Sequence, residues 1–206
     1  HLVLKIDSTQ STASDRMAFY INGVQDNEDS SVTATVYPSQ NAEFKWGENS
    51  ISYVIGRRTH SGYVGNADIQ VADLHYVSGY AYDATAFGYF DDQTGIWKPK
   101  KFTGSYGSAG WHLDFSDTTS TTTLGYDRSG NGNHWTLNNY STDNAILDTP
   151  TNNFPVWNPT TVNMGQGSNG TLTNGNLEWL GTSSNDQCIA TMAVESGKWY
   201  YEVKVG

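Results

Sequence analysis

Gly95-Ile-Trp-Lys-Pro-Lys-Lys-Phe-Thr-Gly-Ser-Tyr-Gly-Ser-Ala-Gly-Trp-His-Leu-Asp-Phe115 is the stretch of sequence that decides the fold class. Its aromatic residues are separated by Gly and Ser at short intervals. Its apolar residues do not recur at the spacing of three or four that an amphipathic helix requires. The pattern therefore predicts short strands joined by tight turns.

The rest of the chain extends this pattern. His1–Asp7 and Met17–Ile21 have strand-like alternation, and Asn22-Gly23 supplies the positive φ angles that a two-residue hairpin turn needs. Further strands are expected at Ser31–Tyr37, Ser50–Ile55, Ala67–Val77, Trp111–Phe115, Trp135–Asn138, Asn176–Trp179, Gln187–Val194 and Lys198–Val205. One helical turn is expected within Ala81–Gly88. Many short strands with turns between them predict an all-β fold, an antiparallel β-sandwich or jelly roll with long loops and almost no helix.

Composition and charge argue against nucleic acid and the membrane interior as partners of this chain. The chain has 206 residues, a net charge of -10 and only 11 Lys plus Arg, so it lacks the basic surface that nucleic-acid binding requires. Its apolar runs are shorter than the roughly 18 residues that cross a bilayer, which predicts no membrane insertion. Its single cysteine excludes an internal disulfide framework. Because the chain starts directly in an apolar alternation without Met, we expect a processed product or a window of a longer protein.

Several strings resemble known virion proteins. The later strands of a laminin-G-like, concanavalin-like jelly roll are similar to Arg16–Asn22, Ile55–Arg57, Asp68–His75 and Phe87-Gly88. Phage and marine metagenomic virion or tail-fibre proteins that carry this jelly roll resemble Thr94–Phe115, Asp127–Asn133 and Asp148–Phe154. The opening strands of a SPRY-like sandwich resemble Asn174–Leu177 and Gly197–Val203. The resemblance implies a virion or extracellular location and no settled biochemical activity.

The resemblance divides the chain into three parts. Residues 1–117 correspond to laminin-G-like sandwich strands, residues 118–170 to an Asn-, Thr- and Pro-rich connecting segment, and residues 171–206 to the start of a SPRY-like sandwich. Each sandwich lacks strands, and a sheet that lacks strands has open edges that favour pairing with other chains. We expect the missing strands to come either from elsewhere in this chain or from a neighbouring subunit.

One loop has the spacing of a calcium ligand set. Asp127, Ser129, Asn131 and Asn133 alternate around Gly132, as in the first half of an EF-hand loop. Position twelve is Asn138 instead of the usual Glu, so the complete loop is missing. Asn and Gly also form ordinary turns. Calcium is the only cofactor that the sequence suggests, and a structural turn is the alternative.

Two tryptophans lie beside turns. Trp46 and Trp157 are candidates for stacking on sugars or for contacts between subunits, because exposed aromatic faces serve both purposes. Asn139-Tyr-Ser141 and Asn169-Gly-Thr171 match the acceptor pattern for N-glycosylation. Asn139 and Asn169 are therefore candidate modification sites.

No catalytic residue is predicted. A glycosidase needs two flanking carboxylates, and the Glu residues occur singly along the sequence. The histidines show no paired ligand spacing: His1, His60, His75, His112 and His134. We therefore expect a non-enzymatic structural or adhesive subunit of a viral appendage or extracellular fibre that assembles with itself. A lectin-like module for surface polysaccharide is the alternative, and a depolymerase fragment is a third, weaker interpretation.

Overall fold

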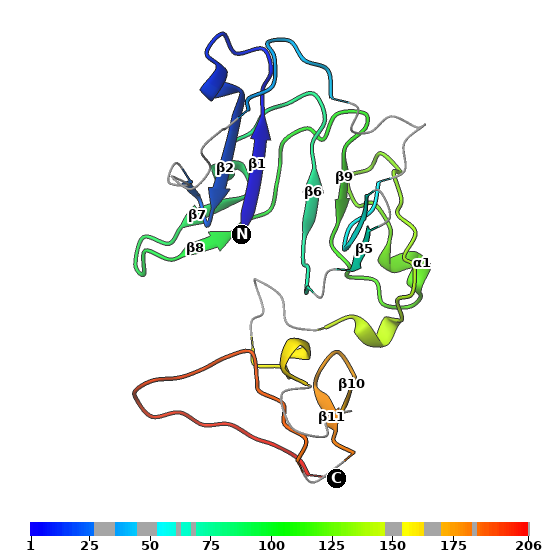
Figure 1. Ribbon diagram of the computed structural model, residues 1–206. Coiled ribbons are helices and arrows are strands. Elements are labelled where there is room, and N and C mark those ends of the chain that lie inside the picture. The colour runs from blue at the N-terminus through cyan, green and yellow to red at the C-terminus, as the bar shows by residue number, and fades with distance from the viewer. Residues whose placement is uncertain are drawn as a thin grey trace. The chain divides into compact units, whose positions relative to one another are not determined.

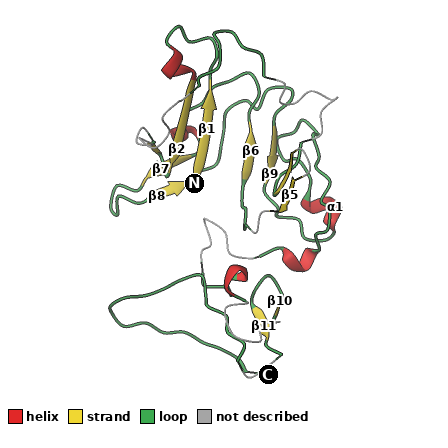
Figure 2. Cartoon of the chain, in the orientation of Figure 1, coloured by secondary structure: helices red, strands yellow, loops and turns green. Residues whose placement is uncertain are grey.

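The computed structural model describes residues 1–26, 36–44, 53–60, 63–66, 69–146, 154–162, 170–182 and 185–205 (Figure 1). Two compact units are present, unit 1 from His1 to Asn139 and unit 2 from Tyr140 to Gly206. The predicted connecting segment 118–170 is divided between them. Figure 2 shows that the described elements are short strands and single turns of helix. No helix in the described part of the chain is long and apolar enough to cross a membrane.

The first sheet of unit 1 contains β1 (Leu2–Ile6), β2 (Met17–Ile21) and β3 (Val24–Gln25). A 3-10 turn, η1 (Ala13–Arg16), precedes β2. The strands are antiparallel. Asn22 and Gly23 join β2 to β3 with φ angles of 48° and 80°, which confirms the predicted hairpin turn.

The other sheets of unit 1 are antiparallel pairs. The bounds are β4 (Arg57–His60) with β5 (Tyr63–Asn66), β6 (Leu74–Tyr76) with β9 (Trp111–Leu113), and β7 (Gly88–Phe90) with β8 (Trp97–Pro99). A 3-10 turn, η2 (Ala84–Ala86), lies within the predicted helical segment. The described residues thus support an all-β class built from small sheets. Neither a sandwich nor a jelly roll is seen among them.

The core of unit 1 explains the opening stretch of sequence. Phe102 is 8% exposed, and its ring packs 4.7 Å from Phe87, 4.9 Å from Tyr106 and 5.2 Å from Tyr82, measured between ring centroids. Among the described residues, Leu113 and Leu124 are the largest side chains with less than about 2% exposure. Phe102 and Tyr106 of this stretch therefore pack in an aromatic core, while Gly residues allow close backbone approaches. At Gly107 the φ angle is 65°, and an added Cβ would lie 1.9 Å from a backbone oxygen.

One helical turn was not expected from the sequence. The Thr-rich run predicts a connection, whereas the structure has α1 (Thr121–Leu124) there. Ser120 and Thr123 form a capping box in which each side chain accepts a hydrogen bond from the other residue's backbone N–H. Thr is a weak helix former, so these caps and the buried Leu124 outweigh the propensity of the run.

Unit 2 has little regular structure among its described residues. A hairpin joins β10 (Thr171–Thr173) to β11 (Glu178–Leu180), and two 3-10 turns precede it, η3 (Thr142–Asn144) and η4 (Pro159–Thr161). Trp157 and Ala190 form an isolated bridge. Several predicted strands are not strands in the structure, which makes those predictions wrong: Trp135–Asn138 in unit 1, and Lys198–Val205 and, apart from the bridge, Gln187–Val194 in unit 2. Their alternation is strand-like, but the described residues give them no partner strand.

Candidate functional site

The pairing of β6 with β9 places two histidines side by side. His75 lies opposite His112 in the register. The backbone N–H of His112 donates to Asp127 Oδ1 at 2.8 Å, and the backbone N–H of Arg128 donates to the His112 carbonyl at 2.7 Å. Because both backbone groups of His112 face this segment, they point away from β6. The two histidines are thus a non-hydrogen-bonded pair, in which side chains come closest. Their rings stack with centroids 4.1 Å apart and planes 10° apart.

Asp73 completes the cluster. Its Oδ1 atom lies 2.6 Å from Nε2 of His112 and 3.4 Å from Nε2 of His75. The hydrogen bond with His112, followed by that with His75, holds the pKa of Asp73 well below its usual range. The φ angle of Asp73 is 56°, a left-handed conformation that Asp tolerates better than most residues.

Both the hydroxyl and the ring of Tyr106 contact His75 of the cluster. The Tyr106 hydroxyl lies 2.7 Å from Nδ1 of His75, and the two rings stack 5.9 Å apart. Burial raises the pKa of this phenol, so the hydroxyl stays neutral. The side chains of His75 and His112 are 13% and 20% exposed, whereas that of Asp73 is 46% exposed. The cluster is therefore closed by aromatic packing on one side and open to solvent at its carboxylate.

Asp73, His75 and His112 place their potential ligand atoms within 4.8 Å of one another and could hold a metal ion. Sequence reasoning missed this group. It found no paired spacing among the histidines, whereas the structure pairs two of them across strands that are distant in sequence. Linear spacing reports ligands on one helix or loop, and only a strand register would have revealed this pair.

The predicted calcium loop lies beside β9. Asp127 is 7% exposed, and both of its carboxylate oxygens accept hydrogen bonds. Oδ1 accepts from the backbone N–H groups of His112 and Ser129, each at 2.8 Å. Oδ2 accepts from the Ser129 hydroxyl at 2.8 Å and from the Asn133 backbone N–H at 2.9 Å. Burial by itself would raise the pKa of Asp127, but these hydrogen bonds lower it overall.

The two asparagines of the loop face a neighbouring turn. The Nδ2 atom of Asn131 donates to the carbonyls of Gly107 and Gly110, and Nδ2 of Asn133 donates to those of Gly110 and Ser108. The structure thus brings all four predicted ligands together. It surrounds the carboxylate with hydrogen-bond donors, which favours the structural turn over a cation site. Calcium binding stays a prediction.

The other predicted residues are dispersed. Trp157 is half-buried, and its ring lies 5.7 Å from that of Trp179, so it packs within unit 2. Asn139 is exposed with a φ angle of 55°. Trp46 and Asn169 lie outside the described residues. Use of Asn139 and Asn169 as glycosylation acceptors stays a prediction.

One face of the first sheet is apolar and exposed. Leu2 pairs with Ile21, Leu4 pairs with Phe19, and directly opposite residues share a face. Val24 pairs with Ile21 on the same face. We call these five residues the apolar sheet face, and their exposed fractions are 66% for Leu2, 44% for Ile21, 47% for Leu4, 38% for Phe19 and 61% for Val24. The opposite face carries Lys5 and Tyr20, which both contact Asp83 beside η2.

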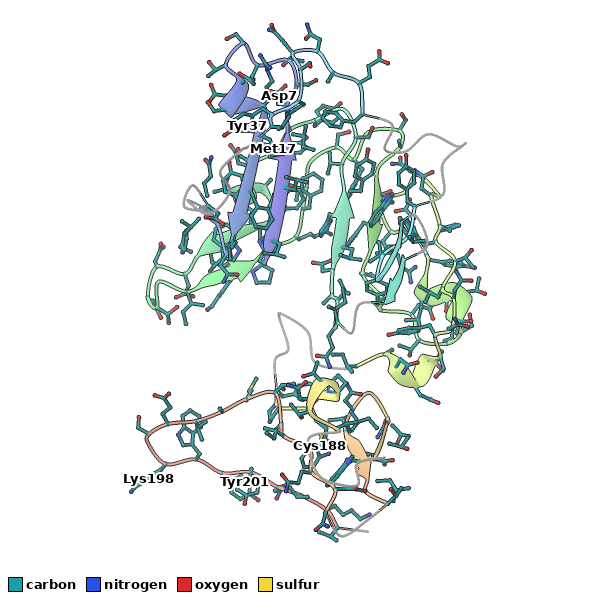
Figure 3. The ribbon with its side chains drawn as sticks, in the orientation of Figure 1. Asp7, Met17, Tyr37, Cys188, Lys198 and Tyr201 are labelled. Carbon is teal, nitrogen blue, oxygen red and sulfur yellow. The ribbon has the colours of Figure 1, made fainter. Side chains whose placement is uncertain are left out.

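A second exposed apolar region lies near the C-terminal end. Residues 198–205 belong to no strand, and among the described residues no backbone hydrogen bond pairs them with another segment. Figure 3 labels Lys198 and Tyr201 along a wide loop that projects from the part of unit 2 that holds β10 and β11. The large side chains of this segment are exposed: Trp199, Tyr200, Tyr201, Val203 and Val205. We call residues 198–205 the open segment.

Comparisons of this chain with protein-family models, with curated proteins and with solved structures each found no match.

Proposed function

We propose that this chain is a non-enzymatic structural or adhesive subunit of a viral appendage or extracellular fibre. In this proposal it assembles with copies of itself through sheet faces, strand edges and aromatic contacts. One observation carries the proposal, the exposed apolar sheet face of β1, β2 and β3.

The two faces of this sheet are arranged in the reverse of the usual way. An antiparallel sheet normally packs its apolar face on a core and leaves its polar face in water. Here the face with Lys5 and Tyr20 bonds to Asp83 within unit 1, while the apolar sheet face is exposed. Complete burial of a fully exposed side chain of this kind contributes about 1.5–3 kcal/mol, and burial of these partly exposed side chains contributes a share of that. Contiguous exposed apolar surface of this kind marks an interaction site.

A sandwich architecture, as the sequence resemblance implies, would account for what covers this face. In a laminin-G-like jelly roll a second sheet packs about 10 Å above the first and buries its inner side chains. The open segment supplies a complementary element, because Trp199, Tyr201, Val203 and Val205 alternate as in a strand that packs one face on a core. A segment without a partner strand can add to a sheet of another subunit by β-augmentation. A second copy of the chain is therefore the proposed partner.

Sedimentation velocity of the full chain over a wide range of concentrations tests the proposal, with electron microscopy of the same samples. We expect association, which Leu4→Ser on the apolar sheet face weakens by about tenfold or more, since a core contact of an interface contributes more than 1 kcal/mol. The matched control is Val36→Ser, because Val36 is 86% exposed and lies outside the described strands. Its association should equal that of the wild type.

A chain that stays monomeric at every concentration, with the backbone amides of 198–205 protected from exchange, would overturn this proposal. The segment would then be paired within its own chain. A glycan-array screen would become the next experiment, because the lectin alternative needs an open polar groove in the monomer.

A further inference from the structure

We propose that Asp73, His75 and His112 bind a transition-metal ion, and that Zn²⁺ is the ion to which their chemistry is suited. The ligands would be one carboxylate oxygen of Asp73 and the Nε2 atoms of the two histidines. The site is independent of the self-assembly proposed above, because the cluster shares no residue with the apolar sheet face or with the open segment.

The ligand set distinguishes between classes of metal. Imidazole nitrogens suit Zn²⁺ and the later first-row ions, whereas Ca²⁺ and Mg²⁺ are bound by oxygen atoms. Two histidines with one carboxylate form the three-ligand arrangement that leaves a fourth position open to water or to a further ligand. This chemistry differs from that of the calcium loop predicted from the sequence at Asp127.

The spacing of the ligand atoms fits a small ion. In a tetrahedral site with bonds of about 2.0–2.2 Å, ligand atoms lie about 3.3–3.6 Å apart. The separation of Asp73 Oδ1 from His75 Nε2 is 3.4 Å, within that range. The separation of Oδ1 from His112 Nε2 is 2.6 Å, a hydrogen bond that an ion would replace. Since the Asp73 side chain is 46% exposed, the carboxylate has room for this adjustment and leaves an entry path for the ion.

The surroundings hold the ligands in place. A metal-binding histidine usually donates its other ring N–H to a fixed acceptor, and the Tyr106 hydroxyl lies 2.7 Å from Nδ1 of His75. When an ion replaces the Nε2 proton that faces Asp73, Nδ1 of His75 would be the donor to the Tyr106 hydroxyl and the Nε2 lone pair would bind the ion. The backbone of His112 is fixed on its outer side by Asp127 and Arg128. The site is thus supported by groups on other elements before any ion arrives.

Two imidazoles around one carboxylate also form a hydrogen-bonded cluster without metal, and zinc titration separates the two cases. We would treat the full chain with a chelator, remove the chelator, and titrate with Zn²⁺ in a calorimeter. We expect one Zn²⁺ per chain. Asp73→Asn should weaken zinc binding by about tenfold or more, and the fold should persist because Asn tolerates the φ of 56° at this position.

Further variants sharpen the test. His112→Gln removes a second ligand and should also weaken binding by about tenfold or more. The matched control is His134→Gln, because the His134 ring accepts the Asp127 backbone N–H at 3.0 Å, and Gln keeps an acceptor there. We expect it to bind Zn²⁺ as the wild type does. Tyr106→Phe removes only the positioning hydroxyl and should weaken binding by about tenfold with the stoichiometry unchanged.

Co²⁺ provides a readout that does not depend on heat, since its visible absorption reports tetrahedral coordination by nitrogen and oxygen ligands. A folded wild type that takes up no Zn²⁺ and gives no such Co²⁺ spectrum would overturn the proposal. So would uptake that Asp73→Asn and His112→Gln, both shown to be folded by circular dichroism, leave unchanged. Should His112→Gln not fold, the result for Asp73→Asn decides.

Discussion

The loop from Asp127 to Asn133 and the open segment both lack strand pairing, yet they differ in how their groups are satisfied. In the loop, the Asp127 carboxylate accepts four hydrogen bonds, and the amides of Asn131 and Asn133 donate to the carbonyls of a neighbouring turn. In the open segment the hydrogen bonds among the described residues are local: the Trp199 indole N–H donates to the Ser196 carbonyl, and the Tyr200 hydroxyl donates to the Glu202 carboxylate. Short polar side chains can supply the hydrogen bonds that an irregular backbone does not receive from a neighbouring strand. Alternating apolar side chains instead need another element that buries them.

Removal of the Asp127 carboxylate is the strongest test of the satisfied loop. Asp127→Ala would leave four donors without their acceptor next to a buried position, and we expect the free energy of unfolding to fall by about 3 kcal/mol or more. Urea denaturation followed by circular dichroism measures the change. The matched control is Asp92→Ala, which removes an exposed carboxylate of unit 1.

We expect the control to change the free energy of unfolding by no more than about 0.5 kcal/mol. If Asp127→Ala were as mild as Asp92→Ala, the loop would be held by its backbone alone. The contrast with the open segment would then be lost.

An acid titration should give a smaller effect at the same residue. The folded-state pKa of Asp127 is lowered from its ordinary value of 3.8, so the folded state favours the charged form. This contribution to stability is fully present above the unfolded pKa and is lost as the pH falls through 3.8 toward the folded pKa. We expect the free energy of unfolding to fall between about pH 5 and pH 3.

Comparison with a variant isolates this residue, because other aspartates, among them Asp73 and Asp83, also have lowered pKa values. The fall should be smaller in Asp127→Asn than in the wild type. Asp92→Asn should keep the pH dependence of the wild type. Identical curves for Asp127→Asn and the wild type would contradict the assigned role of the carboxylate.

Local sequence signals predicted part of this structure. Asn22-Gly23 specifies its own hairpin, and β1 and β2 follow from their alternation, because both signals act over a few residues. The Asp127 loop was recognised as a special turn, but its pattern alone could not distinguish cation ligands from acceptors for backbone N–H groups. The pairing of His75 with His112 depends on a register between distant strands, which no local pattern encodes.

In the open segment the error is the reverse, because the sequence predicts a regular element that the structure does not have. Lys198–Val205 was predicted as a strand from alternation, which describes how a segment fits a half-buried sheet and does not supply the neighbouring strand. The same limit applies to the apolar sheet face, whose residues in β1 and β2 were correctly assigned to strands without any signal for what covers them.

The smallest expected effect on stability is in the open segment itself. Tyr201 and Val205 are 83% and 89% exposed, so Tyr201→Ser and Val205→Ser should each change the free energy of unfolding by no more than about 0.5 kcal/mol in dilute solution. Urea denaturation at low concentration measures this, and sedimentation at high concentration should show weaker association than in the wild type. A loss of more than about 1 kcal/mol in the dilute monomer would mean that these side chains are buried in their own chain. The open segment would then resemble the loop in being satisfied internally, and the partner strand would have to be sought within the same molecule.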